Sequence, residues 1–102
     1  MSESVVIFAC QFKRALVAGD YRLAHEIAEG HWRLGHREAA LLAKGYCNAA
    51  TALVLKGLGR DDAAKRVWAT FEKYRPLQCW LSSEERLMIE VLDHLLEEAL
   101  HS

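Results

Sequence analysis

The sequence has very few of the residues and patterns that interrupt helices or span membranes. Its only proline is Pro76, and no stretch alternates apolar and polar residues between turn signals, as a half-buried strand would. The longest apolar run near the start, Val5 to Cys10, has six residues, whereas a bilayer span needs ~20. Glu3 precedes this run, although a secretory leader begins with basic residues. We therefore expect no strands, no membrane span and no leader.

The sequence also lacks an excess of charge of one sign, and its number of cysteines is odd. Thirteen basic and fourteen acidic residues leave a net charge of −1, without the basic excess typical of proteins that bind nucleic acid or acidic membranes. Secreted domains pair their cysteines in even numbers, but this chain has three, without C-x-x-C spacing. We expect a cytoplasmic protein that binds neither nucleic acid nor membrane.

Helical patterning runs through the whole sequence. The chain has 102 residues, 52% of them hydrophobic and 26% charged, which is the composition and size of one globular domain spanning residues 1–102. Glycines mark the edges of apolar patterns with helical spacing, namely Gly19, Gly35, Gly57 and Gly59. We expect an all-α, up-and-down helical bundle of about five helices, over about residues 4–17, 21–33, 38–56, 61–74 and 83–101.

Signals within these segments make the prediction more specific. Asp20 is placed to cap the second helix, and Ser82 with Glu85 forms a capping-box pattern at the start of the fifth. The third helix is rich in alanine and contains Gly45, so we expect it at the centre, with Gly45 as a structural support where a neighbour comes close. The predicted buried stripe of the fifth helix consists of Leu87, Met88, Val91, Leu92, Leu95, Leu96, Ala99 and Leu100.

One group of residues in the second helix carries chemistry. His25 and Glu29 are four residues apart and Trp32 follows three later, which places all three on one face of a helix. A histidine and a carboxylate at this spacing can share a metal ion, or bond to each other so that the carboxylate fixes the imidazole. A neighbouring tryptophan shields either arrangement from water and strengthens it.

This stretch resembles the His-x-x-x-Glu-x-x-Trp signature of domain of unknown function family 309, a group of small bacterial and archaeal proteins. Gly19 and Tyr21 lie where that family has a glycine and an aromatic residue, and Glu26 occupies its acidic position. The resemblance implies an all-α fold and metal binding at the motif, with Tyr21 as a structural support.

The resemblance extends over about residues 12–77, and the predicted C-terminal helix at 83–101 lies outside it. Residues 44–53 are similar to a glutamine- and alanine-rich segment of the family, and residues 59–64 to its turn into the next helix. Two of the typical glutamines are replaced here, by Lys44 and Asn48. The resemblance supplies no established activity.

Several interpretations of the motif stay open. In the first, His25 and Glu29 are a buried, mutually satisfied pair in a structural or protein-interaction domain, which forms a homodimer or binds a protein partner through an apolar helix face. In the second, they hold a divalent metal ion, and a further donor comes from elsewhere in the chain. The residues that could supply it are Glu26, His36, Cys47 and His94.

Two other functions receive weaker support. The pair could serve acid–base catalysis, although the His-Glu-x-x-His pattern of zinc proteases is absent. The stretch from Gly59 to Pro76 loosely resembles a tetratricopeptide repeat, which suggests a helical adaptor or chaperone, but one repeat cannot bury its own apolar face.

Overall fold

Helices account for nearly all of the chain in a computed structural model, which describes residues 3–35 and 37–102. Within these residues there is no strand, so the prediction of an all-α fold is confirmed. The predicted helix boundaries agree with the observed ones to within one or two residues. The elements are α1 (Glu3–Val17), α2 (Tyr21–Leu34), α3 (Arg37–Gly57), α4 (Asp61–Tyr74), the 3₁₀ helix η1 (Arg75–Trp80) and α5 (Ser83–His101).

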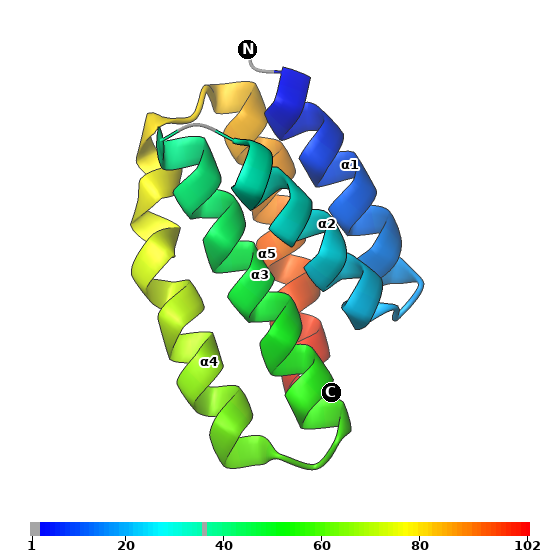
Figure 1. Ribbon diagram of the computed structural model, residues 1–102. Helices are drawn as coiled ribbons and strands as arrows, with labels where there is room; N and C mark the ends of the chain where they lie inside the picture. Colours follow the sequence, from blue (N-terminus) through cyan, green and yellow to red (C-terminus); the bar gives the residue numbers. More distant parts are fainter. Residues whose placement is uncertain (1–2, 36) are drawn as a thin grey trace.

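The five α-helices form an up-and-down bundle in which each runs opposite to the one before it (Figure 1). Helix α3 packs against α2, α4, α5 and η1, while α1 packs against α2 and α5. In the view of Figure 1, α5 lies behind α2 and α3. The predicted central position of α3 is therefore confirmed. None of the helices in the described ranges is long and apolar enough to span a membrane.

Small residues explain why α3 can hold this position. Ala49, Ala50 and Ala52 are completely buried, so neighbouring helices pack directly against its backbone. The closest approach is at Gly45, where an added Cβ would lie 2.8 Å from the Cβ of Tyr74 on α4. Only a residue without a side chain fits at this crossing.

The helices end at glycines and begin with capping residues, as predicted. Gly19 and Gly59 have φ angles of +72° and +76°, which glycine adopts without strain, and both follow helix ends. The Leu23 amide donates to Asp20 Oδ1 at 3.1 Å, which caps α2. Ser82 and Glu85 form the predicted capping box at the start of α5, with bonds of 2.9 and 3.2 Å.

The buried face of α5 differs from the prediction. The residues that it buries are Glu85, Ile89, Leu92 and Leu96, and Ile89 was absent from the predicted stripe. Leu87 and Val91, which were part of it, are 64% and 42% exposed. The prediction was wrong here because apolar residues occupy most of the circumference of this helix. Packing against α1 and α3 selects the face that is buried.

Candidate metal centre

Helix α2 presents His25 and Glu29 at the edge of its buried face. Ala24 and Ala28 precede these two residues and are completely buried, so the side chains next to them lie where α2 meets its neighbours. Each of the two side chains is 34% exposed, and His25 Nε2 lies 3.8 Å from Glu29 Oε2. This distance is too long for a hydrogen bond. The two side chains therefore form a partly exposed ion pair rather than a fully buried hydrogen bond, and their architectural role stays a prediction.

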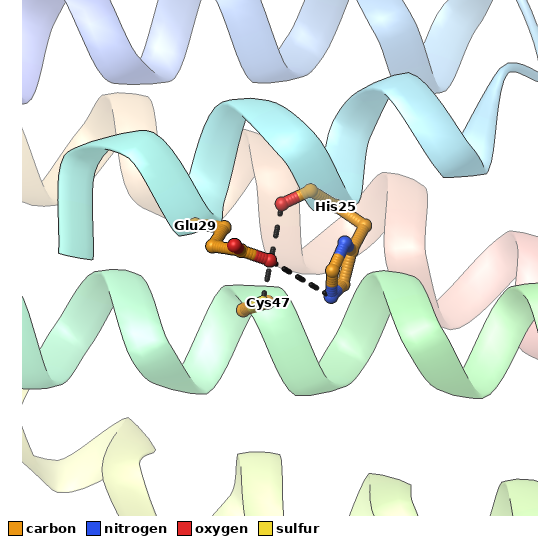
Figure 2. Close-up of side chains that lie close together, drawn as sticks. All are labelled: His25, Glu29 and Cys47. Atoms are coloured by element: carbon orange, nitrogen blue, oxygen red, sulfur yellow. Dashed lines mark hydrogen bonds and ion pairs between the residues drawn. The ribbon is translucent and has the colours of Figure 1, made fainter. Parts of the chain in front are cut away.

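Helix α3 brings a third donor to this pair. Cys47 is buried, with 7% of its surface exposed, and its thiol donates a weak hydrogen bond to the His25 carbonyl oxygen at 3.9 Å. Figure 2 shows His25 and Glu29 extending from α2 toward Cys47 on α3. One ligand atom of each residue lies within 4.8 Å of the others. Of the four residues proposed as further donors, Cys47 joins the pair.

The other proposed donors do not join this group in the described structure. Glu26 is exposed on α2, and His94 is exposed on α5. His36 lies outside the described residues. Among the two supporting residues, Tyr21 packs against the hydrophobic core, and Gly45 lies against Tyr74 at the crossing of α3 and α4.

The protonation state of Cys47 decides how the group behaves without a metal ion. Burial, and then the negative charge of Glu29, raise the pKa of this thiol to about 11. The thiol is therefore protonated at neutral pH and is not an activated nucleophile. A metal ion has to displace its proton.

Glu29 has one carboxylate oxygen available for a metal ion. Its Oε1 forms an ion pair with Arg33 Nη2 at 3.0 Å, while Oε2 faces His25. Arg33 thus orients the carboxylate from the solvent side, as groups beyond the ligands do in known metal sites.

The spacing of the three ligand atoms is close to that of a tetrahedral site. Bond lengths of about 2.0–2.3 Å to nitrogen, oxygen and sulfur place zinc ligands roughly 3.3–3.6 Å apart. The His25–Glu29 separation of 3.8 Å needs only a small change. Ligand atoms at the 4.8 Å limit of the group have to approach each other by about 1.2–1.5 Å. The two side chains on α2 are partly exposed, so they have room to rotate.

Trp32 lies one turn beyond Glu29 and contacts a cation. The ammonium of Lys44 on α3 is 5.2 Å from the centre of the Trp32 ring and 5.8 Å from the centre of the Tyr74 ring. Both distances are within the range of a cation–π interaction. The aromatic member of the motif thus contacts a lysine that lies on α3 three residues before Cys47.

The main buried polar network of the bundle is elsewhere and was not predicted. Tyr46 on α3 is completely buried, and its hydroxyl donates to Asp93 Oδ1 on α5. Gln78 Nε2 on η1 donates to the Tyr46 hydroxyl at 3.0 Å and to Asp93 Oδ2 at 2.9 Å, and Arg75 Nε lies 3.5 Å from Asp93 Oδ2. Burial and the charge of Asp93 raise the pKa of Tyr46 well above its usual value, so the hydroxyl keeps its proton. No motif in the sequence connects these four residues, which lie on three different elements.

Comparison of the chain with known protein families, curated proteins and solved structures finds no match. The resemblance to domain of unknown function family 309 therefore stays a prediction that rests on the motif residues.

Proposed function

We propose that this protein binds a transition-metal ion of the Zn²⁺ class through the His25 imidazole, the Glu29 carboxylate and the Cys47 thiolate. The observation that supports this function best is the convergence of the three donor atoms from two helices within 4.8 Å. The resemblance of the motif to family 309 points to two of these residues, His25 and Glu29.

The chemistry of the donors favours zinc over other common ions. Thiolate and imidazole are ligands of zinc and related transition metals, whereas Mg²⁺ and Ca²⁺ require oxygen ligands. Three protein ligands leave the fourth tetrahedral position for water or another molecule, as in catalytic zinc sites. The partial exposure of His25 and Glu29 makes that position accessible from solvent.

Titration of metal-free protein with Co²⁺ tests the proposal, because cobalt reports tetrahedral thiolate coordination in its absorption spectrum. We expect binding of a single ion, with a thiolate-to-cobalt band that disappears in Cys47→Ser and weakens strongly in His25→Ala. The matched controls are Cys10→Ser and His94→Ala, which change exposed residues outside the group. Absence of binding, or a band that survives Cys47→Ser, contradicts the proposal.

The stability of a Glu29→Ala variant separates this function from a purely architectural pair. Ion pairs of partly exposed side chains contribute little, so the variant should lose less than about 1 kcal/mol of stability while losing metal affinity. A loss of several kcal/mol in metal-free protein would favour the architectural role instead.

A second candidate function, self-association, is supported by α5. Leu87 and Val91 lie one turn apart on its outer face and are 64% and 42% exposed. We propose that this face joins a second copy in a symmetric dimer. Sedimentation of the protein and of a Leu87→Gln, Val91→Gln double variant tests it. A dimer that the double variant breaks supports the proposal, and a wild-type monomer at high concentration overturns it.

A further inference from the structure

Helices α2 and α3 place a positive charge one turn away from the metal group. The two helices run in opposite directions (Figure 1). Along the seam between them, residue numbers therefore increase on α2 where they decrease on α3. Lys44 precedes Cys47 by three residues on α3, and Trp32 follows Glu29 by three residues on α2. The contact between Lys44 and Trp32 therefore lies directly beyond the contact region of Cys47 and Glu29 along the same seam.

Within the described residues, Lys44 has no acidic partner to neutralise it. The ion pairs formed there involve other residues, and the ammonium is held by the faces of Trp32 and Tyr74. Ring faces attract a cation but leave its charge uncompensated. Because Lys44 is half-buried between two rings, its ammonium is also restrained in position.

The charges around the bound ion then favour a negative ligand. A divalent cation is balanced by one thiolate and one carboxylate, so the three-ligand centre is neutral. Arg33 and Lys44 add two positive charges beside it, and Arg33 already pairs with Glu29. The remaining charge of Lys44 attracts an anion to the open position.

The size of the gap suits a small oxyanion. Residues three apart on a helix have Cβ atoms about 5–6 Å apart, which is the spacing of Lys44 and Cys47 along α3. A carboxylate or phosphate with one oxygen on the metal and another accepting from an ammonium spans up to about 7 Å. We propose that the fourth ligand of the metal is such an oxyanion, bound jointly by the ion and by Lys44, with Trp32 and Tyr74 as positioning residues.

This inference rests on the proposed metal site, and one experiment separates the two. Cobalt-loaded protein is titrated with inorganic phosphate, with acetate and with the neutral ligand imidazole, and the cobalt spectrum is followed. We expect at least one of the two oxyanions to change the spectrum saturably. In Lys44→Gln the affinity for that anion should fall about tenfold, the value of one charge-assisted hydrogen bond, while Lys44→Arg retains most of it.

The controls give each outcome a distinct meaning. Imidazole binding should be the same with and without Lys44→Gln, since a neutral ligand gains nothing from the ammonium. Lys65→Gln, which changes an exposed lysine on α4, should leave all affinities unchanged. If cobalt does not bind at all, the metal site is wrong and this inference fails with it. If cobalt binds but neither oxyanion does, or anion affinity is indifferent to Lys44→Gln, only the oxyanion site is wrong.

Discussion

The crossing of α3 and α4 at Gly45 allows a quantitative test of the packing. A Cβ at this position would lie 2.8 Å from Tyr74 Cβ, closer than real Cβ contacts come. Tyr74 Cβ is fixed directly to the α4 backbone, so rotation of the side chain cannot relieve the contact. Gly45→Ala therefore forces the two helices apart, at an overpacking cost of about 1–3 kcal/mol.

Helix propensity acts in the opposite direction and can be measured separately. Alanine in a helix interior is about 1 kcal/mol more favourable than glycine. Gly30 lies inside α2, and a Cβ added there meets nothing within 4 Å. Gly30→Ala should therefore stabilise the protein by about 0.5–1 kcal/mol. Because the propensity gain is common to both variants, the difference between them isolates the cost of the contact.

Thermal and urea unfolding of the two variants give the answer. A change of 1 kcal/mol shifts the melting temperature of a domain of this size by about 4–8 °C. We expect Gly30→Ala to melt above the wild type, and Gly45→Ala to melt roughly 4–24 °C below Gly30→Ala. Equal stabilisation by both substitutions would refute the close approach of α3 and α4 at Gly45.

Three further predictions concern polar groups. Tyr46→Phe leaves Asp93 without its hydroxyl donor and should lower the free energy of unfolding by about 1–3 kcal/mol in urea; unchanged stability would contradict the buried network. Because the pKa of Cys47 is about 11, its thiol has to release a proton when a metal ion binds. The apparent Kd for Zn²⁺, measured by competition with a chelator, should therefore fall about tenfold for each unit by which the pH rises between about 7 and 8.5. A slope that persists in Cys47→Ser would contradict this assignment. Burial lowers the pKa of His31 in the folded protein below the value of about 6.5 that it has in the unfolded chain. As the pH falls below about 6.5, His31 is therefore protonated more readily in the unfolded chain than in the folded protein, and the folded protein loses stability. His31→Gln should reduce the drop in melting temperature between about pH 7 and 5, and an unchanged drop would exclude this contribution.

The helix boundaries were predictable because their causes are local. Asp20 accepts from an amide three residues away, and Ser82 and Glu85 satisfy each other's amides, so the sequence contains both partners side by side. Gly19 and Gly59, which lie where the chain reverses direction, were predictable as well, because their positive φ angles depend only on the backbone at that residue. The 3₁₀ helix η1 was not predicted, because Pro76 indicates where α4 ends but leaves the conformation of the next residues open.

The candidate site was predictable only in part. The spacing of His25 and Glu29 on one helix follows from the sequence, since the geometry of a single helix fixes it. The choice of Cys47 over His94 does not, because it depends on how α2, α3 and α5 pack against one another. The partial exposure of the pair depends on that packing as well.

By itself, the sequence determined the all-α fold, the order and ends of the helices and the central place of the alanine-rich helix. These properties depend on contacts between residues a few positions apart and on side-chain size. Only the tertiary structure decided which face α5 buries, where Tyr46 meets Asp93, and that Cys47 joins His25 and Glu29. Each of these depends on the relative rotation of two helices, which the packing of the whole core sets and no local pattern records.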